Sequence, residues 1–114
     1  MKPQINLIIL RTQNLDRLKN FYEKLLDTKF DEHTDHGPIH YGSKFGEVYL
    51  EIYPTKKNIA QLDGLGFKVS DLEATLKCVD RKNIHKEIEN TDLGLTAIIK
   101  DPDNRLIYLT QIFN

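Results

Sequence analysis

Acidic and aromatic side chains alternate with aliphatic ones between positions 47 and 53. Successive side chains of a β-strand point to opposite faces, so this pattern predicts one aliphatic face and one polar face. The polar face consists of Glu47, Tyr49, Glu51 and Tyr53. Carboxylates accept hydrogen bonds, and phenols donate and accept them while offering rings for stacking. The segment therefore predicts a strand with one side in a core, while the other side either faces solvent or lines a concave binding surface.

The same pattern recurs 57 residues later, at half of the 114-residue length. Leu50 and Ile52 then correspond to Ile107 and Leu109, while Glu51 corresponds to Tyr108. Such a half-length repeat predicts two similar units organised around this pair of strands.

Each half is predicted to contain a strand, a helix and three further strands. For the first half, we expect a strand over 5–11, a helix over 14–26 with Asn14 as its N-cap, a mixed segment over 28–34, and strands over 39–43 and 46–54. For the second half, we expect strands over 64–69, 84–90, 95–99 and 105–113, and a helix that Ser70 or Asp71 caps. The prediction is an α+β fold of two tandem βαβββ modules, about 1–54 and 62–114, within a single domain. Its mixed β-sheet would form a cup with the helices outside.

Composition excludes some functions and leaves others open. The chain has 16 basic and 17 acidic side chains and a formal net charge of −1, so nothing indicates nucleic-acid or membrane-surface binding. The N-terminus lacks the apolar core of a signal peptide, and we expect a cytoplasmic protein. The single cysteine, Cys78, falls on the apolar stripe of the second predicted helix and is expected to be a buried core thiol.

Together, these features resemble a known superfamily. The order of elements, the segment 14–17 leading to Phe21-Tyr22, the strand over 46–53 and the turn over 101–104 are similar to the vicinal oxygen chelate superfamily, also called the glyoxalase, bleomycin-resistance and dioxygenase superfamily. The resemblance covers nearly the whole chain and implies paired βαβββ modules that form a cup. In the metal enzymes of the superfamily, it implies four ligands, usually His or Glu, from the first and last strands of the two modules.

The four ligand positions that the resemblance implies are Leu7, Glu51, Gly64 and Tyr108. Only Glu51 is a good ligand for a divalent metal, whereas a catalytic site of this kind needs about three protein ligands. We therefore expect no metal and no other cofactor. The remaining resemblance is to the metal-free, bleomycin-resistance-like branch, which implies a small cytoplasmic homodimer that binds a small molecule.

Glu51 and Arg11 are the charged candidates for a ligand-binding site. Glu51 would accept hydrogen bonds from a cationic or hydroxylated ligand, or act as a catalytic general base; the alternative is a solvated strand glutamate. Arg11 lies four residues after Leu7, where its guanidinium would hold a carboxylate or phosphate; the alternative is an exposed arginine at a strand end.

Aromatic and histidine side chains supply the remaining candidates. Tyr49 and Tyr108 would stack on a planar ligand, whereas Tyr53 near the strand end is expected to serve packing. His40 would act as an acid, a base or a replacement metal ligand beside Glu51. The spacing of the histidines at 33, 36 and 40 would suit a metal cluster on a helix, but Gly37-Pro38 excludes a continuous helix. A surface hairpin with scattered histidines is the simpler interpretation.

Three functional hypotheses follow. The first is a metal-free protein that binds a small polar molecule through Arg11, His40, Tyr49, Glu51 and Tyr108. The second is a lyase, isomerase or dioxygenase of the same superfamily that uses Glu51 as base or metal ligand. The third is an interaction module whose polar sheet face pairs with a partner protein.

Overall fold

The computed structural model describes residues 3–34, 37–57, 64–92 and 94–112. The chain divides into two compact units, Met1–Ile59 and Ala60–Asn114. No helix in the described ranges is both long and apolar enough to cross a membrane.

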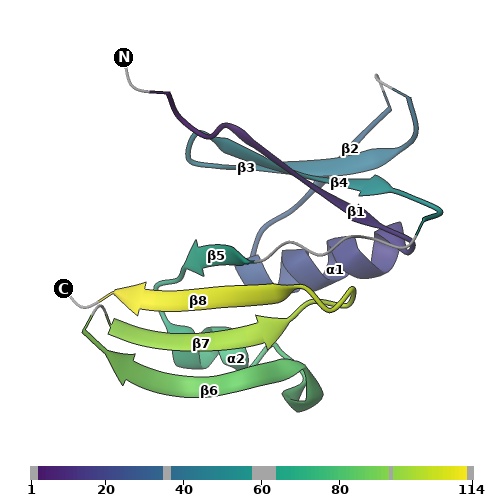
Figure 1. Ribbon diagram of the computed structural model, residues 1–114. Coiled ribbons are helices and arrows are strands. Elements are labelled where there is room, and N and C mark those ends of the chain that lie inside the picture. Colours follow the sequence, from purple (N-terminus) through teal and green to yellow (C-terminus); the bar gives the residue numbers. More distant parts are fainter. Residues whose placement is uncertain (1–2, 35–36, 58–63, 93, 113–114) are drawn as a thin grey trace. The chain divides into compact units, whose positions relative to one another are not determined.

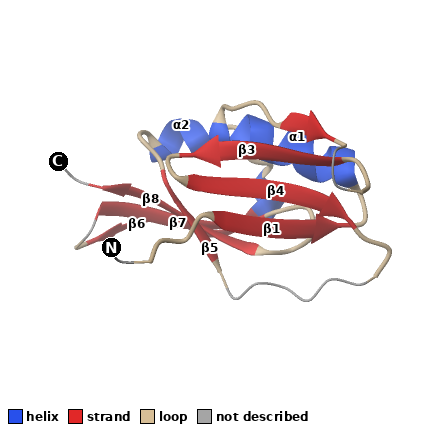
Figure 2. Cartoon of the chain, turned by 90° about the horizontal axis from the view of Figure 1, so that it is seen from above, coloured by secondary structure: helices blue, strands red, loops and turns tan. Residues whose placement is uncertain are grey.

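The first unit has the predicted order of strand, helix and three strands (Figure 1). Its elements are β1 (Leu7–Thr12), α1 (Leu15–Leu26), β2 (Asp31–His33), β3 (His40–Phe45) and β4 (Val48–Pro54). The strands form one sheet in the order β1-β4-β3-β2, in which β1 is parallel to β4 and the other neighbours are antiparallel. Figure 2 shows β1, β4 and β3 side by side in this sheet.

Helix α1 covers one face of the first sheet (Figure 1). Asn14 precedes the helix as its N-cap, and its side-chain oxygen accepts a hydrogen bond from the backbone N–H of Arg17. Asp27 follows the helix as its C-cap and adopts the left-handed conformation with φ 48°. The apolar side chains of the helix and of the facing strands are buried together and form the core of this unit. They are Leu10, Leu18, Tyr22, Leu25, Leu50 and Ile52.

The second unit repeats the topology of the first. Its elements are β5 (Leu65–Lys68), α2 (Leu72–Leu76), the 3-10 turn η1 (Arg81–Asn83), β6 (Ile84–Thr91), β7 (Gly94–Lys100) and β8 (Leu106–Ile112). Its sheet has the order β5-β8-β7-β6, again with a parallel pair at one edge. The pairing keeps the 57-residue offset, because Ile8 lies beside Leu50 in the first sheet and Leu65 lies beside Ile107 in the second. The predicted tandem βαβββ modules are thus confirmed, while the cup and the single domain stay predictions.

The buried thiol predicted at Cys78 is wrong, because Cys78 is exposed. Helix α2 has only five residues and ends at Leu76. Cys78 follows in a turn, where its backbone N–H bonds the carbonyl of Thr75, so helical spacing no longer decides which way its side chain points. Val79, one residue later, is the one that enters the core.

A buried ion pair closes the turn between β7 and β8. Arg105 is only 2% exposed, and its Nη1 lies 2.9 Å from Asp101 Oδ2 and 3.3 Å from Asp103 Oδ2. The other oxygen of Asp101 accepts the backbone N–H groups of Asp103 and Arg105. Asn104 adopts a positive φ of 66°, which asparagine tolerates better than most residues. The Asp-Pro turn predicted from sequence is therefore fixed by a network that satisfies the buried charges.

Candidate ligand-binding site

The predicted site residues of the first unit lie on the sheet face opposite α1, which we call the distal face. The direction of the side chains follows from Tyr41, because Lys19 of α1 lies over its ring with Nζ 5.0 Å from the centroid. Tyr41 therefore faces the helix, and its neighbours His40 and Gly42 face away from it. The distal face is formed by Leu7, Ile9, Arg11, Asp31, His33, His40, Gly42, Lys44, Tyr49, Glu51 and Tyr53.

Four planar side chains stack in a row across all four strands of this sheet. The guanidinium carbon of Arg11 on β1 lies 5.6 Å from the ring centroid of Tyr53 on β4. The Tyr53 ring stacks on His40 of β3 at 4.1 Å and 8°, and His40 stacks on His33 of β2 at 5.4 Å and 18°. These contacts form one continuous row of side chains from β1 to β2 on the distal face.

His40 is buried, with 3% of its surface exposed. The hairpin of exposed, scattered histidines is therefore the wrong interpretation for this residue, because cross-strand neighbours cover both faces of its ring. Its Nδ1 lies 3.1 Å from the carbonyl oxygen of Pro38. A carbonyl only accepts, so Nδ1 donates the proton in this contact. Position 36, the third member of the histidine spacing, is outside the described residues.

Glu51 lies in the middle of the distal face and is half-buried. The Tyr53 hydroxyl donates a long hydrogen bond of 3.5 Å to its Oε1. Gly42 lies directly opposite Glu51 on β3, and a Cβ there would meet Glu51 Oε2 at 3.3 Å and His33 Nε2 at 3.6 Å. A glycine inside a strand often marks a close approach. Here the missing side chain leaves room for a carboxylate and an imidazole to approach the same point.

Apolar side chains adjoin Glu51 on the side of β1. Ile9 is its direct neighbour in the register, and Leu7 lies beside Tyr49 one pleat further along. Leu7, Ile9 and Tyr49 are 47%, 39% and 47% exposed. Lys44 lies over the Tyr49 ring, with Nζ 5.6 Å from the centroid. The distal face thus combines a polar row at one end with an exposed apolar area at the other.

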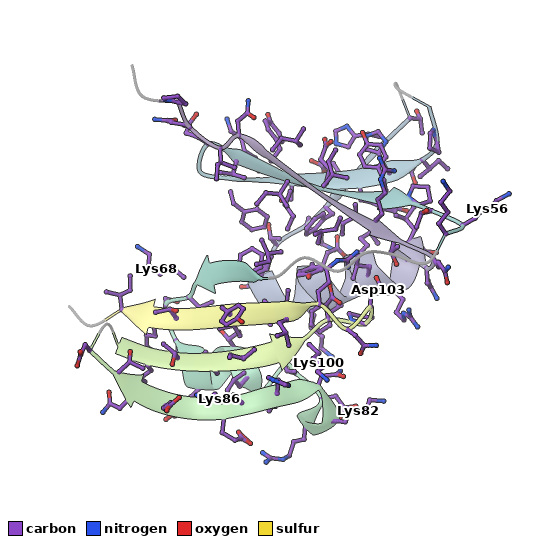
Figure 3. All side chains as sticks on the ribbon, viewed as in Figure 1. Lys56, Lys68, Lys82, Lys86, Lys100 and Asp103 are labelled. Atoms are coloured by element: carbon purple, nitrogen blue, oxygen red, sulfur yellow. The ribbon has the colours of Figure 1, made fainter. Side chains whose placement is uncertain are left out.

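Tyr108 belongs to the second unit, where it lies on the sheet face opposite α2. Its ring covers Gly64, since a Cβ at Gly64 would come within 2.8 Å of Tyr108 Cε1. Lys68 on β5 and Lys100 on β7 share this face by strand alternation, and Figure 3 labels both. The structure brings Arg11, His40, Tyr49 and Glu51 together on one sheet, while a shared site with Tyr108 stays a prediction.

The residues at the metal positions implied by the resemblance do not fit a metal. Leu7 and Gly64 have no ligating side chain, and the ring of Tyr108 occupies the space above Gly64. Among the described residues, no group of three or more His, Cys, Asp or Glu side chains is placed to hold a metal ion.

Sequence reasoning missed His33 and Gly42 as members of the site. His33 is level with His40 only because β2 and β3 pair as a hairpin, and this register depends on the length of the turn between them. The available signal was the pair of histidines at opposite ends of a Gly-Pro turn. Gly42 gave a weaker signal, an isolated glycine in a strand-like segment.

Surface hollows also occur elsewhere in the described chain. One hollow of about 360 Å³ lies at the end of α1, around Glu23, Lys24 and Asp27. Another of about 380 Å³ lies between α2 and β6, with an aliphatic floor that includes Leu76 and Ile88. Neither contains a residue that the sequence predicted for the site.

Comparison with protein families identifies a superfamily that covers most of the chain. The model described as Glyoxalase/Bleomycin resistance protein/Dioxygenase superfamily matches residues 4–109. No curated protein sequence matches the chain.

Solved structures of similar fold cover nearly the whole chain. TnmS3, described as an antibiotic binding protein from Streptomyces sp. CB03234, is 19% identical, with a TM-score of 0.70 and 98% of each chain covered. The oxidase ChaP-H2 is 18% identical, with a TM-score of 0.77, 97% of this chain and 94% of that chain covered. The fosfomycin resistance protein FosX from Mesorhizobium loti is 15% identical, with a TM-score of 0.70, 99% of this chain and 94% of that chain covered. At these identities, the likeness shows the fold alone.

Proposed function

Because the chain belongs to the Glyoxalase/Bleomycin resistance protein/Dioxygenase superfamily, we propose that it binds a small polar molecule on the distal face without a bound metal. The observation that carries the proposal is the row of Arg11, Tyr53, His40 and His33 beside the carboxylate of Glu51. Arg11 and Tyr53 bring a guanidinium and a phenol hydroxyl to this face, and the Glu51 carboxylate and the His33 imidazole both approach Gly42. Binding sites commonly combine an apolar surface with a few convergent polar groups.

The similar structures support a small molecule as the ligand. TnmS3 is described as antibiotic binding, and FosX is described as a fosfomycin resistance protein. Fold alone does not fix function, so the proposal depends on the residues of the distal face rather than on these neighbours.

A screen with a matched pair of variants tests the proposal. Thermal unfolding of the wild-type protein is measured with a library of antibiotics and small metabolites, because a ligand of the folded state raises the melting temperature. Every compound that stabilises the wild type is then measured with Glu51→Gln and Glu47→Gln. Both variants lose one carboxylate, but Glu47 is exposed in the turn between β3 and β4. We expect Glu51→Gln to reduce the shift and Glu47→Gln to leave it unchanged; equal shifts for both variants would contradict the proposal.

One observation favours a second candidate, a metal-free enzyme of the lyase or isomerase type. The carboxylate of Glu51 accepts a hydrogen bond from the Tyr53 hydroxyl, and it and the His33 imidazole both approach Gly42; such groups exchange protons with substrates in acid–base catalysis. This candidate requires turnover of a compound from the screen. Turnover that Glu51→Gln abolishes and Glu47→Gln preserves would favour the enzyme over the binding protein.

The proposal also includes a homodimer. Strand β1 is at the edge of the first sheet, and Ile5, which precedes it, is 72% exposed. Edge strands with apolar side chains favour association with another strand. Light scattering after size exclusion measures the mass, and a monomer at all concentrations would contradict this part.

A further inference from the structure

His40 lies between two other rings of the stacked row on the distal face. The Tyr53 ring is 4.1 Å away with its plane inclined by 8°, and the His33 ring is 5.4 Å away at 18°. Tyr53 and His33 come from the strands on either side of β3, so they cover opposite faces of the His40 ring. His40 is therefore only 3% exposed and has almost no surface for a ligand to contact.

The orientation of the His40 ring is itself fixed by the chain. Its Nδ1 donates a hydrogen bond to the carbonyl oxygen of Pro38, which is 3.1 Å away. A hydrogen bond is directional, and close packing on both faces restricts a side chain to one conformation. The ring is thus a fixed plane against which the neighbouring rings align.

Both neighbours of His40 carry a polar group toward Glu51 or its surroundings. The Tyr53 hydroxyl donates to Glu51 Oε1 over 3.5 Å. His33 Nε2 and Glu51 Oε2 approach the same glycine, at 3.6 and 3.3 Å from the point where a Cβ of Gly42 would lie. His40 thus stacks on the two side chains whose polar atoms lie near this carboxylate.

The second sheet forms without such a stack. The pair that corresponds to His40 and Tyr53 in the second sheet is Thr96 and Thr110, which lie opposite each other. Each pair lies two residues along its strands from Glu51 or from the counterpart of Glu51. Threonines have no rings to stack, yet the order of the four strands is the same. The topology of the module therefore does not require the stack, which leaves the distal face as its place of action.

We propose that His40 is a positioning residue of the candidate ligand-binding site. The plane of its ring sets the side-chain conformations of Tyr53 and His33, and these two side chains arrange the polar groups around Glu51. Under this proposal Tyr53 meets the ligand and His40 holds it from behind, which reverses the roles that the sequence suggested for the two residues. The inference rests on the proposed function, because it assigns a role within that site.

Two substitutions of His40 separate the plane of the ring from the volume of the side chain. His40→Phe and His40→Leu both lose the hydrogen bond to Pro38 and keep an apolar side chain, but only phenylalanine has a flat ring for stacking. Three-bond NMR couplings from Cγ to the backbone nitrogen and carbonyl carbon show whether a side chain keeps one χ1 rotamer. They are measured on ¹³C,¹⁵N-labelled wild type and variants.

In the wild type, we expect one χ1 rotamer each for Tyr53 and His33. His40→Phe should preserve both, whereas His40→Leu should average the couplings of both over several rotamers. Tyr22, which is fully buried in the core, should keep one rotamer throughout and shows that each variant is folded. Leu25→Ala is the control for general destabilisation, because it removes a buried side chain of α1. It should leave the couplings of Tyr53 and His33 unchanged.

Three results would overturn the inference. Averaged couplings of Tyr53 and His33 in the wild type would show that the stack does not hold them. Equal couplings in His40→Phe and His40→Leu would show that the ring plane is not the cause. Averaging in Leu25→Ala would show that loss of stability alone releases the two side chains. If His40→Leu does not fold, His40→Met replaces it, because methionine is also apolar without a plane.

The antibiotics and metabolites of the screen connect this role with binding. Each compound whose effect depends on Glu51 is titrated into the two His40 variants. We expect His40→Leu to weaken binding about tenfold and His40→Phe to change it less than about twofold, because side chains that are no longer held must be ordered on binding. Equal affinities would overturn the inference and leave the proposed function standing. If no compound depends on Glu51, the proposed function fails, while the couplings still decide whether His40 holds its neighbours.

Discussion

The His40 ring stacks face to face on Tyr53, with centroids 4.1 Å apart and planes inclined by 8°. His40 lies on β3 and Tyr53 on β4, so the contact joins neighbouring strands of the distal face. Through Tyr53 it extends to Arg11, and through His33 it reaches the edge strand β2. One row of side chains therefore joins all four strands of the first sheet.

Removal of the His40 ring should destabilise the first unit. His40→Ala loses a buried ring, its stacking on two neighbours and its hydrogen bond to Pro38, so we expect a loss of about 2–4 kcal/mol in the free energy of unfolding. Urea denaturation measures it. His85→Ala is the control, because His85 is exposed on β6 and should change stability by less than about 0.5 kcal/mol. Similar losses for both variants would show that the stack contributes nothing.

The buried ion pair between Asp101 and Arg105 should matter far more than an exposed one. Arg105→Met leaves the carboxylate of Asp101 buried without its cation, and we expect a loss of about 3–5 kcal/mol. Arg81→Met makes the same change at the exposed pair with Glu87 and should cost less than about 1 kcal/mol. Chemical denaturation of both variants gives the comparison, and equal costs would refute this account of the turn.

Tyr41 should ionise at a higher pH than a free tyrosine. Partial burial, then the negative charges of Glu32 and Asp16, raise the pKa of its phenol above 10.0, against the opposing effect of Lys19. Because the folded state favours the neutral phenol, Tyr41 contributes to the free energy of unfolding. This contribution is fully present below pH 10.0 and is lost as the pH rises through the pKa of Tyr41 in the folded state. The phenolate absorbance of wild type minus Tyr41→Phe isolates this residue.

Glu32→Gln should lower the pKa of Tyr41, because it removes the adjacent charge that the hydroxyl faces at 3.4 Å. Glu47→Gln, which removes a carboxylate from the turn between β3 and β4, provides the control. If Glu32→Gln leaves the pKa of Tyr41 unchanged, the charge of Glu32 is not a cause of the raised pKa.

The purified protein should contain no stoichiometric metal. Only Glu51 among the four implied ligand positions is a strong ligand, and the Tyr108 ring covers Gly64. Elemental analysis, followed by thermal unfolding with added nickel, zinc, manganese or iron, measures this directly. One metal per chain that is retained by wild type and lost on Glu51→Ala would overturn the metal-free proposal.

Much of the fold could be predicted because its determinants are local in the sequence. The alternation around Glu51 predicts β4 and its two faces, and the helical spacing after Asn14 predicts α1. The 57-residue offset predicts the repeat. In the structure, residues that pair in the parallel strands of the first unit correspond, 57 positions later, to residues that pair in the second. These signals depend on the period of side chains along a single element, so no knowledge of tertiary contacts is needed.

The candidate site was only partly predictable. Glu51, Tyr49 and Arg11 follow from strand alternation, but the participation of His33 and Gly42 depends on how β2, β3 and β4 pair. A shift of one residue in that register would turn the same side chains to the opposite face. Likewise, Cys78 is exposed because α2 ends early, which helical periodicity does not reveal.

The sequence by itself determined the order of the elements, the two faces of each strand and the unsuitability of the implied metal positions. Only the tertiary structure decided that His40 is buried in a stack and that Glu51, Gly42 and His33 meet. The physical reason is that these contacts join different strands, whose alignment is set by turn lengths and core packing rather than by the pattern within any one strand.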